Sequence, residues 1–278
     1  MDRYGTVNAN ALVACSPEEV VFRRVQVSES VWRALLASRT AGAAAVAPVT
    51  DPAASEEATW ALYSPLLAET AAAPFVFAQI GQSLDGRVAT VSGDARDISG
   101  RGGLEHLHRC RALADAVIVG VTTALKDDPR LTVRLVDGDN PARVVIDPKG
   151  RLDNDAALLR DDGTRRLVVQ ACARGRPAGV EVVRLDEKDG RLCPRAIVAA
   201  LAARGLRRIL VEGGGLTIGR FLDAGLVRRL HVAISPLLIG AGPNGLVTAP
   251  SARLADARRP VTRVFGLGGD VLFDCVLD

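Results

Sequence analysis

Three consecutive glycines beside an acidic residue are the part of this sequence best suited to chemistry. Gly213, Gly214 and Gly215 follow Glu212, which ends a run of apolar residues typical of a buried strand, and a helical pattern begins directly afterwards. Backbone N–H groups at such a junction are free, and without a Cβ in the way an anion such as a pyrophosphate can approach them closely. The spacing is neither G-x-G-x-x-G nor a Walker loop. The sequence therefore predicts a nucleotide or phosphate site of another kind, the alternative being a tight turn whose glycines serve packing.

Other polar segments follow the strands predicted nearby. The segment from Gln79 to Arg87 follows a strand at residues 75–80, and the segment from Gly120 to Thr132 follows a strand at residues 116–119. The second segment contains Thr123 and the adjacent acids Asp127 and Asp128, which could accept hydrogen bonds from ribose hydroxyls. Since ligands of open α/β sheets bind beyond the carboxyl ends of strands, Asp127 and Glu212 are our candidate catalytic acids.

A helix predicted at residues 102–113 contributes a further candidate. Its Arg111 could bind a phosphate through the planar guanidinium group, and the alternative is a solvated helix face. Ser99, in the polar loop before this helix, is a plausible N-cap.

Strands and helices alternate from Pro74 onward. We expect further helices at residues 194–204 and 216–223. We expect further strands at residues 143–146, 167–169, 180–185, 208–211, 230–234, 262–265 and 271–276. The last two strands flank Gly268-Gly269-Asp270 and are typical of a hairpin. The order predicts an α/β fold with a mainly parallel sheet, an antiparallel C-terminal hairpin and helices on both faces.

Residues 1–72 differ in composition from residues 73–278, and we expect an N-terminal extension followed by one larger domain. Ser28 can cap a helix that places Trp32 and Leu35 on one face, and a second short helix begins at Ser55. An Ala- and Pro-rich linker separates the two helices. The tryptophans of this segment could anchor it on the main domain or form a lid or partner surface.

Composition excludes several classes of protein. The net charge is +3 and aromatic residues are 4% of the chain, which argues against a nucleic-acid partner. Five cysteines without a C-x-x-C pair suit a reducing compartment. His106 and His108 are two residues apart and point to different helix faces, so we predict no metal site. With no apolar run of membrane-spanning length and no secretory pattern, we expect a cytoplasmic protein outside the membrane.

The order of these segments resembles the RibD C-terminal family, the reductase half of the bifunctional riboflavin-biosynthesis enzymes. The resemblance covers roughly residues 74–277. Six segments carry it: Ser83-Leu84-Asp85-Gly86-Arg87; His108-Arg109-Cys110-Arg111-Ala112; Asp127-Asp128-Pro129 with Leu131-Thr132 and Arg134; Arg143-Val144-Val145-Ile146-Asp147; Leu210-Val211-Glu212-Gly213-Gly214; and Pro236 with Leu238-Ile239-Gly240.

The resemblance implies a fold like that of dihydrofolate reductase, usually as a homodimer. It also implies an NADPH-dependent reductase of a phosphoribosylaminopyrimidine of the 5-amino-6-(5-phosphoribosylamino)uracil type, with hydride delivered to the ribose C1′. The matching substrate-binding positions are Arg111, Leu131, Arg134 and Glu212. The matching cofactor-binding positions are Gly81, Thr123, Asp127 and the glycine loop and helix, comprising Gly213, Gly214, Gly215, Leu216, Thr217, Ile218, Gly219 and Arg220.

This chain departs from the family pattern at two places. Ala95 and Asp97 stand where the family often has a serine and a tryptophan, and Pro148 follows Asp147 where a cofactor-binding serine is expected. From their charge, Lys149 and Arg151 could instead hold an NADP 2′-phosphate. Two alternatives stay open: an NADPH-dependent reductase of a dihydropterin or dihydrofolate, and a non-catalytic nucleotide-binding paralogue.

Overall fold

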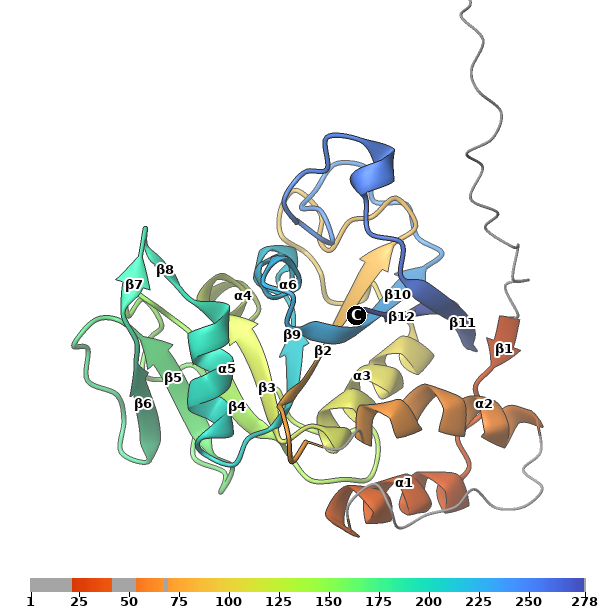
Figure 1. The fold of residues 1–278 in the computed structure, drawn as a ribbon, viewed down its shortest axis with the longest axis horizontal. Coiled ribbons are helices and arrows are strands. Elements are labelled where there is room, and N and C mark those ends of the chain that lie inside the picture. Colours follow the sequence, from red (N-terminus) through yellow and green to blue (C-terminus); the bar gives the residue numbers. More distant parts are fainter. Residues whose placement is uncertain (1–21, 42–53, 68–69, 278) are drawn as a thin grey trace, which may run out of the picture.

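The structure is a computed structural model that describes residues 22–41, 54–67 and 70–277. Within these ranges, ten strands form one sheet with the order β1-β11-β12-β10-β2-β9-β3-β4-β5-β6 (Figure 1). Its strands are β1 (Phe22–Arg24), β2 (Phe75–Ser83), β3 (Ala116–Gly120), β4 (Ala142–Ile146), β5 (Arg166–Gln170), β6 (Val180–Arg184), β9 (Arg208–Glu212), β10 (Val227–Ser235), β11 (Val261–Leu267) and β12 (Asp270–Val276). A separate hairpin pairs β7 (Glu187–Lys188) with β8 (Arg191–Leu192).

The sheet is parallel from β10 to the edge strand β6, and its antiparallel pairings involve β12. The run β10-β2-β9-β3-β4-β5-β6 is parallel throughout. Strand β12 is antiparallel to both β10 and β11, which confirms the predicted C-terminal hairpin. Strand β1, which the sequence analysis did not anticipate, pairs in parallel with β11 at the edge of the sheet.

Helices cover both faces, as predicted. They are α1 (Glu29–Ala41), α2 (Ala54–Tyr63), α3 (Arg101–Leu113), α4 (Val121–Asp127), α5 (Pro194–Ala202) and α6 (Gly215–Asp223), with short 3-10 helices at residues 64–67, 157–159 and 254–256. Alternate strand residues point to opposite faces. Val117 of β3 therefore packs in the cluster of α1 to α4, whereas Ile118 packs in the cluster of α5 and α6.

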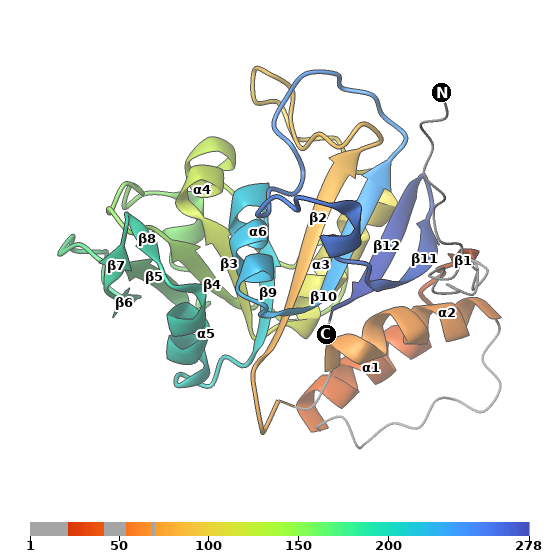
Figure 2. The same cartoon turned by 45° about the horizontal axis from the view of Figure 1, so that its top comes forward.

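The two N-terminal helices pack on the face of the sheet that α3 covers, and they lie side by side (Figures 1 and 2). Trp32 is 5% exposed, donates a hydrogen bond from Nε1 to the carbonyl oxygen of Asp137 (2.9 Å) and contacts the ring of Tyr63 edge-on. Trp60 packs partly buried against the same cluster. These contacts support the anchoring alternative for the described part of this segment, while the Ala- and Pro-rich linker lies outside the described residues.

Helix starts were predicted with mixed success. The backbone N–H of Val31 donates to the Oγ of Ser28 (3.3 Å), so Ser28 caps α1 as expected. The prediction that Ser99 caps α3 was wrong, because the N-cap is Gly100, whose N–H donates to the carboxylate of Asp270 (2.9 Å). The segment after β3, which we treated as a polar loop, forms α4.

Within the described part of the chain, no helix has the length and apolar character needed to span a bilayer.

Candidate active site

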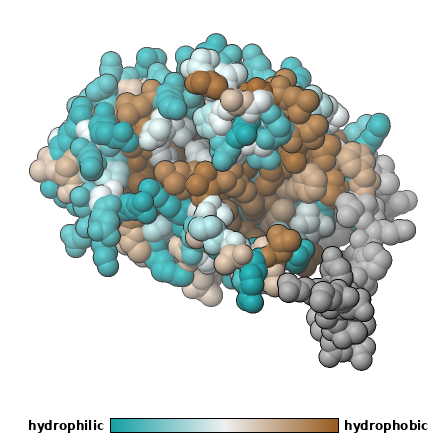
Figure 3. Space-filling model, turned by 90° about the horizontal axis from the view of Figure 1, so that it is seen from above, coloured by the Kyte–Doolittle hydropathy of each residue, from teal (hydrophilic) through white to brown (hydrophobic). Residues whose placement is uncertain are grey.

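A cavity of about 750 Å³ lies at the carboxyl ends of the central parallel strands. Gly81 of β2, Gly120 of β3, Ile146 of β4 and Glu212 of β9 all line it. They meet because β2, β9, β3 and β4 are parallel neighbours, so their carboxyl ends share one edge of the sheet. Seen from above, apolar side chains run through the hollowed middle of the molecule between polar rims (Figure 3).

The glycine loop forms one wall of this cavity, and its three positions tolerate only glycine. Gly213 and Gly214 have φ angles of +83° and +66°, in the left-handed region that side chains disfavour. A Cβ on Gly214 would lie 2.8 Å from the Oγ1 of Thr123, and one on Gly215 would lie 1.7 Å from the carbonyl oxygen of Gly245. The loop therefore turns sharply while another backbone segment packs directly against it.

The first turn of α6, directly after this loop, has backbone N–H groups that are available to a ligand. The N–H groups of Thr217 and Ile218 both donate to the carbonyl oxygen of Gly214. The N–H groups of Gly215 and Leu216 have no hydrogen-bond partner among the described residues. Together with the positive end of the helix dipole, they form a site suited to an anion.

A buried ion pair fixes the acid of the cavity. The guanidinium of Arg111, on α3, donates from Nε to Oε2 of Glu212 (2.7 Å) and from the second nitrogen to Oε1. The remaining nitrogen donates to the carbonyl oxygen of Thr132 (2.9 Å). The two charged side chains are only 7% and 12% exposed. This bidentate geometry holds the carboxylate in one orientation at the end of β9.

Cationic groups gather beside this pair. Burial, and then the nearby charges of Arg111 and Arg130, lower the pKa of Arg134, whereas Glu212 raises it. The backbone N–H groups of Arg134 and Leu135 donate to the Nδ1 of His108 (2.9 and 3.3 Å). Burial, and then the nearby charges of Arg111 and Arg134, lower the pKa of His108 to about 4. A neutral histidine thus anchors the segment that carries Arg134, and the surplus positive charge suits a phosphate.

Most of the predicted cofactor residues line the cavity. They are Gly81, Thr123, Asp127, Lys149, Gly213, Gly214, Gly215, Leu216, Thr217 and Arg220. Ile218 and Gly219 do not, because Ile218 points into the core and Gly219 packs against the carbonyl oxygen of Val247. Of the predicted substrate residues, Glu212 lines the cavity, whereas Arg111, Leu131 and Arg134 lie outside its lining. Leu131 is buried at a positive φ of +54°.

The remaining candidates differ in their surroundings. Asp127 ends α4, and burial raises the pKa of its carboxyl group, with Lys126 opposing the shift. Asp147 faces inward, where it accepts hydrogen bonds from Arg176 and from the N–H groups of Arg151 and Leu152. The turn that follows it leaves Lys149 and Arg151 at the cavity, where Arg151 also reaches the hydroxyl of Thr122 (3.4 Å).

Sequence reasoning missed the later part of the loop after β10. Pro243, Asn244 and Val247 line the cavity, whereas the family segment quoted from this loop ends at Gly240. Asp85, in the loop after β2, holds that segment in place. A hydrogen bond from Ser83, and then backbone N–H groups of Ile239 and Gly240, lower the pKa of Asp85 to about 2.

The histidine considered for a metal also has partners that the sequence did not suggest. The structure groups His106 with Cys110 and His231, in a cluster where all three side chains are buried. Our prediction of no metal site weighed the pair His106 and His108 and did not take this cluster into account.

The doubly covered, mostly parallel sheet and the cavity beside its glycine loop define a dihydrofolate reductase-like α/β protein. Sequence comparison gives the family: the RibD C-terminal domain matches residues 74–259. The chain therefore belongs to the RibD C-terminal domain family, as its resemblance predicted.

Two curated relatives show the range of this similarity. The chain is 33% identical over 212 residues to a 2,5-diamino-6-ribosylamino-4(3H)-pyrimidinone 5′-phosphate reductase of Methanothermobacter thermautotrophicus, covering 72% of this chain and 97% of that protein. It is 32% identical over 199 residues to the riboflavin biosynthesis protein RibD of Escherichia coli, covering 66% of this chain but only 54% of that protein. The chain thus matches about half the length of this RibD relative.

Solved structures agree on the fold. A deaminase/5-amino-6-(5-phosphoribosylamino)uracil reductase from Thermotoga maritima superposes with a TM-score of 0.67 at 26% identity, covering 80% of this chain and 62% of that one. The riboflavin biosynthesis reductase Rib7 of Saccharomyces cerevisiae has a TM-score of 0.63 at 21% identity, covering 79% of this chain and 97% of that one.

Proposed function

We propose that this chain is an NADPH-dependent reductase of riboflavin biosynthesis that reduces the ribose C1′ of a ribosylaminopyrimidine 5′-phosphate. The names of the Methanothermobacter relative and of the Thermotoga structure support this substrate class. The observation that carries the proposal is the Arg111–Glu212 pair, which fixes an acid in the cavity wall directly before the glycine loop. A carboxylate and an anion site then lie next to each other. The carboxylate can bind a pyrimidine ring while the anion site binds a phosphate of the cofactor.

The residues around the cavity fit a nicotinamide dinucleotide. The free N–H groups of Gly215 and Leu216 would hold a pyrophosphate, and Lys149 and Arg151 would hold the 2′-phosphate that distinguishes NADPH from NADH. When bound, the cofactor supplies the hydride. The protein positions the two reactants and excludes water.

The substrate groups have matching partners. A carboxylate has about four lone-pair sites, so Glu212 can accept a hydrogen bond from a pyrimidine N–H while it remains bound to Arg111. Arg134 supplies charge for the 5′-phosphate. Opening the ribose ring requires a proton on the ring oxygen, and Asp127 suits this role because burial raises the pKa of its carboxyl group.

The proposal is tested by following NADPH oxidation with four acceptors. Two are phosphorylated: the aminouracil ribosyl phosphate and the diaminopyrimidinone ribosyl phosphate. The third is the dephosphorylated form of whichever of these two is turned over faster, and the fourth is a dihydropterin. We expect one of the two phosphates to be turned over, with a kcat/KM at least about 100-fold above that of its dephosphorylated form, because charge-assisted contacts to Arg134 are lost.

Two outcomes would replace the proposal with its alternatives. Preferential turnover of the dihydropterin, with no dependence on a phosphate, would indicate a pterin reductase. NADPH binding without turnover of any acceptor would indicate a non-catalytic paralogue, in which Ala95 and Asp97 mark a lost substrate site.

We further propose that the chain acts as a cytoplasmic homodimer. An exposed apolar patch supports the dimer: Leu84 and Leu238 are 63% and 73% exposed, and Leu237, 40% exposed, accepts a hydrogen bond from the N–H of Leu84. Light scattering of the purified chain measures the oligomer directly, and a monomer at micromolar concentration would contradict the proposal.

The division into an extension of residues 1–72 and a reductase domain of residues 73–278 also remains a proposal. Because Leu35 of α1 and Leu62 of α2 share a hydrophobic cluster with Phe77 of β2, we expect the two parts to unfold together. A single calorimetric transition would support this expectation.

A further inference from the structure

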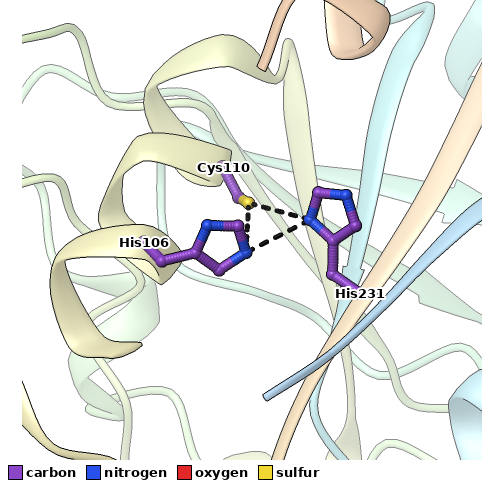
Figure 4. Close-up of side chains that lie close together, drawn as sticks. All are labelled: His106, Cys110 and His231. Atoms are coloured by element: carbon purple, nitrogen blue, oxygen red, sulfur yellow. Dashed lines mark hydrogen bonds between the residues drawn. The ribbon is translucent and has the colours of Figure 1, made fainter. Parts of the chain in front are cut away.

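A buried cluster of two histidines and a cysteine lies between α3 and the face of the sheet that this helix covers (Figure 4). None of the three residues lines the cavity. His106 and Cys110 are four residues apart on α3, so both side chains lie on one face of that helix. His231 points toward them from β10, near the centre of the sheet. The side chains of all three residues are fully buried, and both elements that hold them are well packed.

The three facing atoms form a triangle of metal-ligand size. His106 Nε2 lies 3.1 Å from His231 Nδ1, and Cys110 Sγ lies 3.5 Å and 3.8 Å from these nitrogens. A point near the centre of this triangle is roughly 2 Å from each atom, whereas zinc–nitrogen and zinc–sulfur bonds are about 2.0–2.1 and 2.3 Å. An ion could therefore be bound with shifts of a few tenths of an ångström.

Hydrogen bonds alone do not satisfy this triangle well. An imidazole nitrogen offers either one proton or one lone pair in the plane of its ring. Each nitrogen here faces two other atoms, the second nitrogen and the sulfur, so it can serve only one of them properly. A cation at the centre would be bound by all three lone pairs at once.

The far sides of both histidines have the partners that metal-bound histidines commonly have. The hydroxyl of Tyr63 lies 3.0 Å from His106 Nδ1, and Asp274 Oδ1 lies 3.3 Å from His231 Nε2 without the alignment of a hydrogen bond. Asp274 is held by Arg229 (2.6 and 2.8 Å) and by Arg263 (3.0 Å). Such outer contacts orient the rings and select the nitrogen that binds the metal.

We propose that His106, Cys110 and His231 bind a thiophilic metal ion, Zn²⁺ or Cu⁺, as a structural site. A set of two imidazoles and one thiolate suits these soft or borderline ions and not Mg²⁺ or Ca²⁺. The thiolate cancels the charge of Cu⁺ and leaves one positive charge on Zn²⁺. Arg229 and Arg263 already neutralise Asp274, so this carboxylate does not offset the charge of a bound metal. A Cu⁺ site would therefore bury less net charge than a Zn²⁺ site. Zn²⁺ would also need a fourth ligand such as water.

The site would connect three parts of the fold. Its ligands join α3 to β10, and through Tyr63 the outer contact extends to α2. Arg111, which holds Glu212, directly follows the ligand Cys110 in the chain. Binding a metal here would therefore stiffen the helix that positions the acid of the cavity, without contacting the cavity itself.

The test uses the full chain, purified from medium containing zinc and, separately, with copper added under reducing conditions. We expect one equivalent of one of the two metals by elemental analysis, and a Tm that falls by several degrees when a chelator removes it. Replacement by Co²⁺ should give a near-ultraviolet sulfur-to-cobalt absorption band. A Cu⁺ site would instead resist zinc exchange and release its metal to a Cu⁺ chelator.

Matched variants assign the band to this cluster. Cys110→Ala should remove both the bound metal and the cobalt band, whereas Cys193→Ala, at an exposed thiol, should keep them. If Cys110→Ala does not fold, the wild-type measurements decide alone. Substoichiometric metal in the wild-type chain, together with a Tm that neither ion changes and no cobalt–sulfur band, would overturn the proposal.

Discussion

Arg111 and Glu212 form a buried bidentate ion pair that joins α3 to the carboxyl end of β9, across 101 residues of sequence. The pair brings the helix on one face of the sheet into contact with the wall of the cavity. Its consequence is that the acid of the cavity cannot be altered without also affecting the packing of α3.

Glu212→Gln is therefore expected to reduce both stability and activity. The substitution leaves the guanidinium of Arg111 without its counter-charge, and breaking a buried pair costs roughly 3–5 kcal/mol. We expect a clear loss in the free energy of unfolding, measured with urea, and a fall in kcat/KM of at least about 100-fold. Glu105→Gln is the control, since among the described residues Glu105 forms ion pairs with Arg101 and Arg109 of the same helix and should change stability by less than about 1 kcal/mol. Equal effects of the two substitutions would contradict the assigned role.

Gly214→Ala should weaken cofactor binding. The added methyl group would be strained by the φ of +66° and would meet Thr123 Oγ1 at 2.8 Å, in the wall of the cavity. Gly205→Ala is the matched control, because Gly205 has a φ of +80° but no atom of the described residues within 4 Å of the added Cβ. Both variants should lose roughly 1–2 kcal/mol of stability from backbone strain, but only Gly214→Ala should raise the KM for NADPH. An unchanged KM in that variant would count against the glycine loop as the cofactor site.

Charge reversal at Lys149 tests the site of the 2′-phosphate. If Lys149 binds this group, Lys149→Glu should raise the KM for NADPH by about 10-fold or more at low salt while that for NADH changes little, because only NADPH carries the phosphate. Arg253→Glu makes the same change in net charge at an exposed side chain outside the cavity lining and should leave both values near wild type. NADPH affinity that survives Lys149→Glu at low salt would place the 2′-phosphate elsewhere.

Acid should destabilise the fold through His108. Burial lowers its pKa from 6.5 to about 4, so the unfolded chain binds the proton more readily than the folded one. The stability that the neutral form contributes is complete above pH 6.5 and is lost as the pH falls toward 4. His108→Asn keeps an acceptor for the N–H of Arg134 but does not titrate, so its Tm should fall less steeply over this range. A Tm profile identical to that of the wild type would show that His108 does not contribute to it.

The main features of the fold were readable from the sequence because they are local. Strands with alternating or continuous apolar residues, and Pro194 at a first helical turn, follow short-range rules. Strand β1 was missed because three residues give no periodicity. Helix α4 was missed because its short sequence begins with Val121 and two threonines, which disfavour helix, so its position after β3 decided the outcome.

The site was predictable in part for the same reason. Glu212 and the glycines after it form a local signal, and the end of a parallel strand gives their location. The pairing of Glu212 with Arg111, and of His231 with His106, depends on which strand lies beneath α3. Neither spacing nor residue type encodes that neighbourhood, so these contacts required the tertiary structure.

Helix α3 has one further consequence. Among its thirteen residues only Arg101 is fully exposed, and Gly102 and Gly103 lie where a Cβ would strike the carbonyl oxygen of Leu267 and the carboxylate of Asp270. In a library that samples every amino acid at every position, α3 should therefore accept fewer replacements than α5, whose outer face is open to solvent. Efforts to diversify this protein would best leave that helix unchanged and vary the loops that border the cavity.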